Sequence, residues 1–404
     1  MSAIFDLVLG VVTSIGGFVE AGSISTAAQA GSEFGLQLLW AIAIATVTLA
    51  MLVEMSGRLS AVARRSMVAA VRERFGIKFQ IVPLAAELVI DVLLLAAEAG
   101  GAAIALRLLT GVAWLWFVVP LGVLVWCVLW WGGFGVIEYG LGLLGLVTLS
   151  FVYAAMRLQP DPADLLHSFV PSMPQHDPAR YAFIAVSIVG ATISPYLLNF
   201  YSSGGIEEKL AEEELWVNRV TAYLGMCFGG VVSMGVLVTG ALVLQPQHII
   251  VDSYEQIALM FVPVFHQWAV PLFAASLGIG CFGAAVEIAL NAGYVCAQVL
   301  GWSWGVNRPR RDAARFAAAF TVVLAVATAV ALLGFDPLQL TLLCVALTVV
   351  IMPLVVLPFL ALMNDPKYVK THSSGPVGNV LLAVLTIAGA VLAVIVIPLE
   401  LMGG

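Results

Sequence analysis

Apolar stretches separated by short polar segments recur along the whole chain. Stretches of about 20 apolar residues are long enough to cross the hydrocarbon core of a bilayer as helices. The pattern predicts eleven spans, at residues 7–27, 36–56, 80–107, 113–132, 135–157, 181–203, 218–245, 268–300, 314–334, 337–362 and 376–402. The expected fold class is an all-α polytopic membrane protein, with the lipid bilayer as its first partner.

Composition supports this class and excludes several others. Of the 404 residues, 62% are hydrophobic and 10% are charged, whereas soluble domains carry about 25% charged residues. The first apolar stretch lacks the positive leading region of a signal peptide, so we expect it to be retained. The five cysteines fall in apolar segments without a Cys-x-x-Cys pair, which predicts buried small hydrophobes and no disulfide or zinc site. No motif points to an enzyme, a cofactor or a nucleic acid.

The basic residues predict how the chain is oriented. Twelve of the 17 fall in loops on one side of the predicted bundle, between spans two and three, eight and nine, and ten and eleven: Arg58, Arg64, Arg65, Arg72, Arg74, Lys78, Arg308, Arg310, Arg311, Arg315, Lys367 and Lys370. The positive-inside rule makes that side cytoplasmic. We expect a multi-pass protein of a bacterial-type plasma membrane, with the N-terminus inside and the C-terminus outside.

Two predicted spans contain groups that interrupt a membrane helix. The first contains VEAGSIST (19–26), which has a carboxylate, a glycine and three hydroxyls, and the sixth contains GATISPYLLNFYSS (190–203), with Pro195 near its middle. Proline removes a backbone hydrogen bond, and freed backbone groups in lipid must be satisfied by protein or a cavity.

The two interruptions occupy matching places. If residues 7–157 and 181–362 are two five-helix repeats, followed by an extra helix at 376–402, each interruption falls in the first helix of a repeat. An odd number of helices gives the repeats opposite topology, and interrupted helices at matching positions indicate a transport site. We therefore predict one transporter domain over 1–404 with these substrate-binding residues: Glu20, Gly22, Ser23, Ser194, Tyr196 and Asn199.

The segment EAGSISTAAQAGSEFGLQLLW (20–40) resembles the first-helix signature of the NRAMP metal transporters, including its Gln-Ala-Gly and Phe-Gly-x-Gln-Leu-Leu-Trp parts. Segments 56–76, 95–109, 190–203 and 352–365 resemble other parts of that family, in order. The resemblance implies a LeuT-type inverted repeat of five plus five helices with helices one and six interrupted. It also implies secondary-active transport by alternating access.

The functional positions depart from the family pattern. Relatives that import manganese and iron use Asp and Asn in the first helix, Met and His in the sixth, Gln in the tenth and an Asp in the third. The corresponding residues here are Glu20, Ser23, Ser194, Tyr196, Val345 and Leu95. A neighbouring glutamate of the third helix is kept as Glu98.

These substitutions change the chemistry of the predicted site. Thioether and imidazole ligands favour softer transition metals, whereas oxygen ligands suit Mg²⁺. We expect a hard divalent cation such as Mg²⁺, with weak or absent Mn²⁺ and Fe²⁺ selectivity, held by Glu20, Ser23 and Ser194. The alternative is a small polar organic solute, such as a carboxylate or an amino acid, bound at a half-helix N-terminus.

Further acids lie within predicted spans, where ionisable groups are costly. Glu87, Asp91 and Glu98 fall on one stripe of the third helix, which indicates either proton or ion coupling or a buried polar stripe. Glu287 is followed one turn later by Asn291, which indicates either a functional intramembrane acid or a polar contact between these two side chains.

Overall fold

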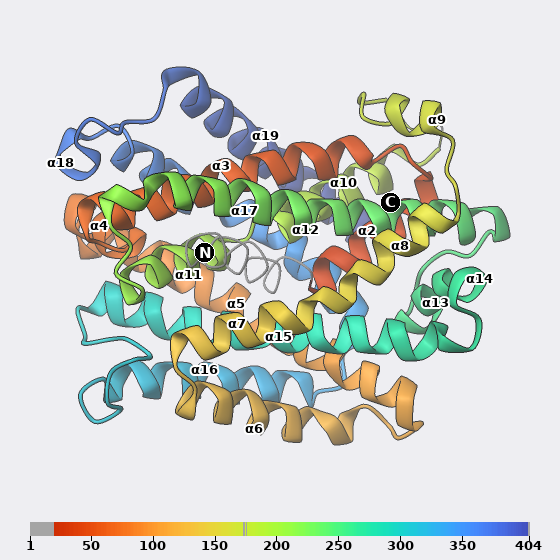
Figure 1. Cartoon of the computed structure of the whole chain (residues 1–404), viewed down its shortest axis with the longest axis horizontal. Helices are drawn as coiled ribbons and strands as arrows, with labels where there is room; N and C mark the ends of the chain where they lie inside the picture. The colour runs from red at the N-terminus through yellow and green to blue at the C-terminus, as the bar shows by residue number, and fades with distance from the viewer. Residues whose placement is uncertain (1–19, 173, 175, 403–404) are drawn as a thin grey trace, which may run out of the picture.

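The computed structural model describes residues 20–172, 174 and 176–402, and every regular element in these residues is a helix. Figure 1 shows the helices that build the bundle, most of them running along the long axis of the molecule. They are α2 (Ala21–Phe34), α3 (Leu39–Ala63), α5 (Ile77–Thr110), α6 (Leu115–Trp131), α7 (Phe134–Gly145), α8 (Leu149–Arg157), α10 (Pro178–Thr192), α11 (Pro195–Glu207), α12 (Leu215–Val243), α15 (Ala269–Leu300), α16 (Ala314–Ala331), α17 (Pro337–Leu362) and α19 (Pro376–Leu401).

Nine helical stretches of the described residues are long and apolar enough to cross a membrane, and Leu115–Trp131 is a shorter apolar helix. Together they correspond to predicted spans two to eleven. Of the first predicted span, residues 7–19 lie outside the described part of the chain. The prediction of a polytopic helical membrane protein is therefore confirmed.

The first interruption is shorter than the sequence predicts. Helix α2 begins at Ala21, directly after Glu20, and continues to Phe34, past the predicted end at residue 27. Its hydroxyl-rich first turns are helical, and the hydroxyls bond within the helix: Ser25 donates to the Ala21 carbonyl at 2.6 Å and Thr26 donates to the Gly22 carbonyl at 2.8 Å. Side-chain hydroxyls can thus be satisfied by the preceding helical turn instead of ending the helix.

The sixth span is broken where the sequence predicts it. Helix α10 ends at Thr192 and α11 begins at Pro195, and Ser194 between them has an extended backbone (φ −99°, ψ 137°). Proline suits the first position of a helix because its missing N–H has no intrahelical partner there. The break therefore follows from local sequence.

Short helices close the two ends of the bundle. One end, here called the basic end, carries α4 (Met67–Phe75), α18 (Pro366–Val369) and the loop 301–313 (Figure 1). Ion pairs join these segments, including Arg74 with Asp365 at 3.2 Å and Lys367 with Glu73 at 2.9 Å. The three basic loops thus lie at one end, as the charge pattern predicts.

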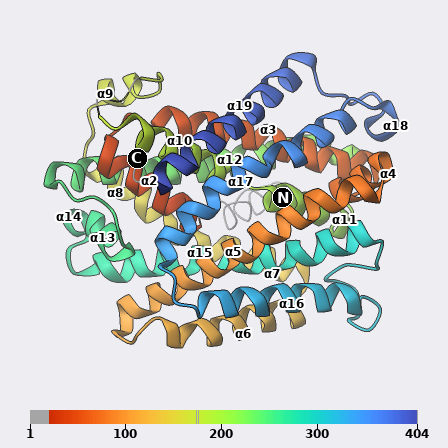
Figure 2. The ribbon, with the colours of Figure 1, turned by 180° about the vertical axis from the view of Figure 1, so that it is seen from behind.

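The opposite end carries α9 (Pro162–His167), α13 (Tyr254–Ala258) and α14 (Val262–Phe265). There Arg180, at the start of α10, pairs with Glu33 of α2 at 2.9 Å and also with Glu400 of α19. One guanidinium therefore joins three helices, two of which meet at the breaks. Figure 2 shows α19 lying across the outside of this region.

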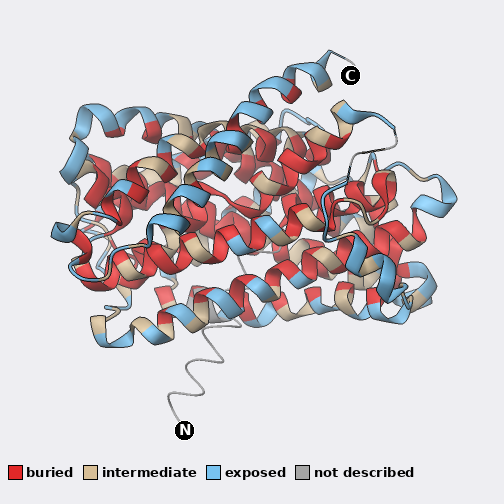
Figure 3. Ribbon diagram, turned by 90° about the horizontal axis from the view of Figure 1, so that it is seen from above, coloured by how far each residue is buried: buried red, intermediate tan, exposed pale blue. Residues whose placement is uncertain are grey.

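The core is built around α2, α5, α12 and α15. Gly31 allows α2 to approach α12 closely, because a Cβ there would lie 2.3 Å from the Leu237 carbonyl oxygen. Gly101 of α5 similarly accommodates the Cys281 sulfur of α15, which would lie 2.7 Å from an added Cβ. Figure 3 shows buried residues concentrated on these inner helices and exposed ones on the periphery. The two breaks consequently lie inside the protein.

Candidate functional site

A hydrogen bond joins the two breaks directly. The Tyr196 hydroxyl, in the first turn of α11, donates to Glu20 Oε2 at 2.7 Å, although these residues are 176 positions apart. Both residues are 1% exposed. The backbones are close as well, since a Cβ on Gly22 would lie 3.4 Å from the Ala191 Cβ of α10. The structure thus brings the first-helix carboxylate to the sixth-helix break.

The remaining predicted residues at the breaks are also buried. Ser194 is 0% exposed and its hydroxyl donates back to the Gly190 carbonyl at 3.1 Å, so it does not cap α11. Ser23 is 4% exposed. Val345 of α17 covers Gly22, because its Cγ1 would lie 2.9 Å from an added Cβ. Val345, which stands where the metal-importing relatives have a glutamine, therefore lies in this region and gives it an apolar side chain.

A second carboxylate lies at the start of α2. The backbone N–H of Ala21 donates to Glu98 Oε2 of α5 at 3.3 Å, and Glu98 is 0% exposed. Helix N-termini favour negative charge because their first N–H groups are not bonded within the helix. The N-termini of α2 and α11 both lie beside the Glu20 carboxylate. This arrangement favours negative charge at the break.

The neighbourhood holds groups whose proximity the sequence could not show. Glu287 of α15, 6% exposed, lies close enough to Glu20 for their charges to interact. The Cys281 thiol interacts with Glu98, so this cysteine is more than the apolar filler that the sequence predicts. Both contacts arise from packing α15 against α5, and no local motif signals them.

The described residues do not form a ready-made metal cage. No three of their His, Cys, Asp and Glu side chains are arranged as ligands for one ion. Glu20 Oε1, however, is buried and has no hydrogen-bond partner among them. A cation at the break would need this oxygen together with hydroxyl, carbonyl or water oxygens.

Four other polar residues form a separate group, here called the acid–amide cluster: Glu87, Asp91, Asn199 and Asn291. Asn199 Nδ2 of α11 donates to Glu87 Oε1 at 2.7 Å. Asn291 Nδ2 of α15 donates to Glu87 Oε1 at 3.0 Å and to Asp91 Oδ2 at 3.1 Å. All four residues are at most 3% exposed.

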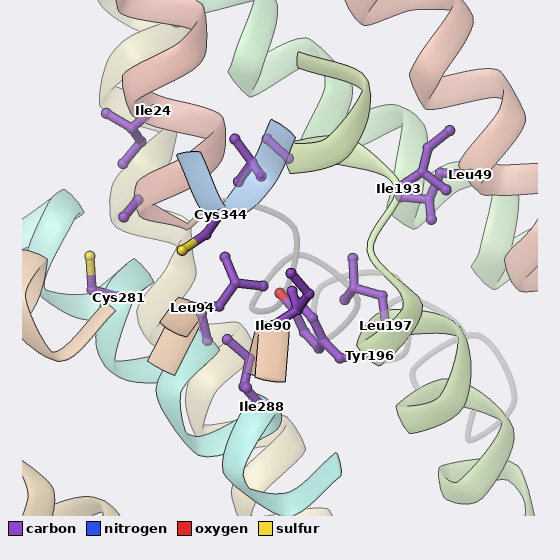
Figure 4. Close-up of a cluster of buried hydrophobic side chains, with 14 of the residues drawn as sticks. Ile24, Leu49, Ile90, Leu94, Ile193, Tyr196, Leu197, Cys281, Ile288 and Cys344 are labelled. Carbon is purple, nitrogen blue, oxygen red and sulfur yellow. The ribbon is translucent and has the colours of Figure 1, made fainter. Parts of the chain in front are cut away.

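This cluster changes two predictions. Asn199, expected with the substrate-binding residues, lies with Glu87, one turn along α11 from Tyr196. Asn291 gives its amide hydrogens to α5 instead of to Glu287, because the facing helix offers two carboxylates. The acids of α5 thus belong to two groups, with Glu98 beside the break. Figure 4 shows Tyr196 near Ile90 and Leu94 of α5.

Comparisons with known proteins agree on one family. A family model described as "Natural resistance-associated macrophage protein-like" matches residues 10–398. A divalent metal cation transporter MntH of Deinococcus radiodurans is 26% identical over 98% of this chain and 89% of its own. The MntH protein of Erwinia tasmaniensis is 27% identical over 70% of this chain and 69% of its own.

Solved structures share the fold of this chain. A manganese transporter of Eremococcus coleocola has a TM-score of 0.78 at 18% identity, covering 96% of this chain and 85% of that one. The inward-facing structure of the transporter Mhp1 has a TM-score of 0.61 at 16% identity, covering 96% and 88%.

Proposed function

This chain belongs to the Nramp family of membrane transporters and has their LeuT-type fold, and from that premise we propose that it is a secondary-active carrier of divalent cations. We propose further that it carries a hard cation such as Mg²⁺ by alternating access, with weak or absent selectivity for Mn²⁺ and Fe²⁺. The relatives named as divalent metal and manganese transporters support the general substrate class.

The observation that carries the proposal is the Glu20 carboxylate between the two breaks, with one oxygen bonded to Tyr196 and the other without a partner among the described residues. The sixth-helix positions that provide a thioether and an imidazole in the manganese importers hold Ser194 and Tyr196. Glu20, Ser23 and Ser194 would supply oxygen ligands, which suit Mg²⁺ with part of its water shell retained.

The surrounding charge supports a divalent ion better than the sequence alone does. One carboxylate is few for such an ion, but Glu98 and Glu287 lie near Glu20 and would add to the local negative potential when they are ionised. Coulomb attraction does not require direct coordination. The cation would therefore be held by Glu20 and stabilised by two outer carboxylates.

The organic-solute alternative gains no support from the MntH proteins or the manganese transporter, which are named for metal transport. The neighbourhood of the site also contains one soft ligand, a thiol. Thiols are soft ligands, and the Cys281 thiol lies beside Glu98. Because that thiol hydrogen-bonds to Glu98, we propose that it leaves the preference for hard ions intact.

Coupling and orientation complete the proposal. Glu98, Asp91 and Glu87 are proposed to couple transport to a proton or another ion, since they are buried on the helix that faces both polar groups. The basic end is proposed to face the cytoplasm, because basic loops are retained on that side.

Ion competition in proteoliposomes tests the proposed selectivity. Uptake of Mg²⁺ should saturate, excess Mg²⁺ should suppress any Mn²⁺ uptake, and calorimetry should show Mn²⁺ and Cd²⁺ binding no tighter than high micromolar. The Cys281→Ser variant is the control for the thiol and should leave Cd²⁺ binding unchanged. Saturable Mn²⁺ uptake that resists Mg²⁺ would contradict the proposal.

A further inference from the structure

The acid–amide cluster holds two carboxylates that no basic side chain in the described part of the chain neutralises. Glu87 and Asp91 are one helical turn apart on α5, and a single amide, that of Asn291, donates to both. None of the ion pairs among the described residues includes either acid. Two buried carboxylates with only amide donors are costly, because neutral donors do not replace the lost solvation of a charge. The cluster therefore favours a positive charge.

Unused oxygen atoms at the cluster point to a ligand. Asn199 Oδ1 and Asn291 Oδ1 are buried and have no hydrogen-bond partner among the described residues, although the same amides donate to the acids. Gln80 Oε1, on the same helix as the acids, is buried without a partner in that part of the chain as well. Buried amide oxygens are normally satisfied. Their lone pairs are acceptor sites that a cation would fill.

A small cavity lies beside two of these three amides, those of Gln80 and Asn199. It has a volume of about 10 Å³ and is lined by Gln80, Glu87 and Asn199 together with apolar side chains that include Met67 and Val68 of α4. Such a volume holds about one water molecule or one ion of similar size. Because α4 belongs to the basic end, the cavity lies on the side of the cluster that faces that end.

The donor set and the volume select the ion. Carboxylate and amide oxygens are hard ligands, which exclude a preference for soft metals. Mg²⁺ dehydrates reluctantly and keeps several waters, and Ca²⁺ takes six to eight oxygens, so neither suits a cavity of this volume with three polar side chains in its lining. A monovalent ion loses its water more readily, because the cost of desolvation grows with the square of the charge. We propose that the acid–amide cluster binds one Na⁺ ion.

The same helix would connect this ion to the transport site. Tyr196 and Asn199 both lie in the first turns of α11, and they bond to Glu20 and Glu87 respectively. An ion that draws Asn199 toward α5 would thus also fix the position of Tyr196 at the break. A coupling role of Na⁺ in transport rests on the proposed function, whereas the binding of Na⁺ does not.

Thermal unfolding of the purified full-length protein tests the binding. Ligands of the folded state raise its stability with the logarithm of their concentration. The midpoint should rise with NaCl at constant ionic strength, with N-methylglucamine chloride as the balance, and KCl should have a smaller effect. In Asp91→Asn the half-saturating Na⁺ concentration should increase at least about tenfold, and Glu87→Gln, which keeps the side-chain volume, should show the same effect if Asp91→Asn does not fold.

Matched variants distinguish this proposal from the proposed function. Glu20→Gln should keep the Na⁺ response and lose the response to Mg²⁺. An unchanged Na⁺ response in both Asp91→Asn and Glu87→Gln would overturn the Na⁺ site. Equal stabilisation of the wild-type protein by Na⁺ and K⁺, with further stabilisation only on acidification, would also overturn the Na⁺ site. The cluster would then bind a proton. A normal Na⁺ response without any divalent transport would remove the proposed function and leave the Na⁺ site standing.

Discussion

Acidic residues in the middle of the bundle and at its basic end have opposite surroundings. Glu20, Glu87, Asp91 and Glu98 are at most 3% exposed, and within the described residues their partners are hydroxyl, amide, thiol and backbone groups. Glu73 at the basic end has a side chain that is 36% exposed and pairs with Lys367.

The difference separates two uses of one residue type. Exposed pairs add little to stability because water screens both charges. A buried acid without a basic partner costs stability, and in membrane proteins such acids mark ion pathways. The comparison predicts that neutralising an acid affects transport in the middle of the bundle and affects almost nothing at the basic end.

Glu20→Gln should give the largest effect. The substitution keeps the side-chain shape but removes the charge at the breaks, so divalent-cation uptake should fall to background and affinity by at least about tenfold. Isotope uptake and calorimetry measure these quantities. The matched control is Glu54→Gln, because Glu54 is 6% exposed but paired with Arg58 at 3.1 Å. Equal loss of uptake in both variants would show that an unpaired buried acid and a paired one do not differ in their effect on transport.

Tyr196→Phe should give an intermediate effect. It removes the hydroxyl that orients Glu20 at 2.7 Å, and hydrogen bonds to charged groups contribute about 1.5–3 kcal/mol. We expect cation affinity to fall by roughly tenfold or more while uptake at saturating concentration persists. Tyr254→Phe is the control, since its hydroxyl faces Thr341 at 3.4 Å. Unchanged affinity in Tyr196→Phe would show that the bond does not position the carboxylate.

Glu73→Gln should give the smallest effect. The hydrogen bond from Lys367 holds the pKa of the Glu73 carboxyl below its ordinary value of 4.5, so its contribution to folding exists above that pH and disappears as pH falls through the lowered pKa. Because the side chain is more than a third exposed, neither uptake nor the thermal midpoint at neutral pH should change measurably. A clear loss of stability at pH 7 would mean that the Glu73–Lys367 pair stabilises the fold despite its exposure.

The helices and breaks could be predicted because their causes are local. Apolar run length determines the spans, and Pro195 begins α11 where the sequence indicates. The first interruption was predicted too broadly, because hydroxyls such as Ser25 and Thr26 can bond to their own helix, and composition does not reveal which choice they make.

The partners of the buried polar groups depend on how distant helices pack. Glu87, Asp91 and Glu98 share a stripe on α5, yet α15 and α11 present amides to the first two, and the start of α2 presents a backbone N–H to the third. Helix periodicity gives the direction of a side chain and not the identity of what faces it. For the same reason the i+4 spacing of Glu287 and Asn291 was a poor guide to their contacts.

The guanidinium of Arg180 has a consequence for the kinetics of opening. It holds α2, through Glu33, and α19, through Glu400, to the start of α10. Moving either helix away from this end would break a pair with a guanidinium that is only partly exposed, so each separation should cross its own energy barrier. Because neither pair includes a residue at the break, we expect these barriers to be the same whichever cation is bound at Glu20.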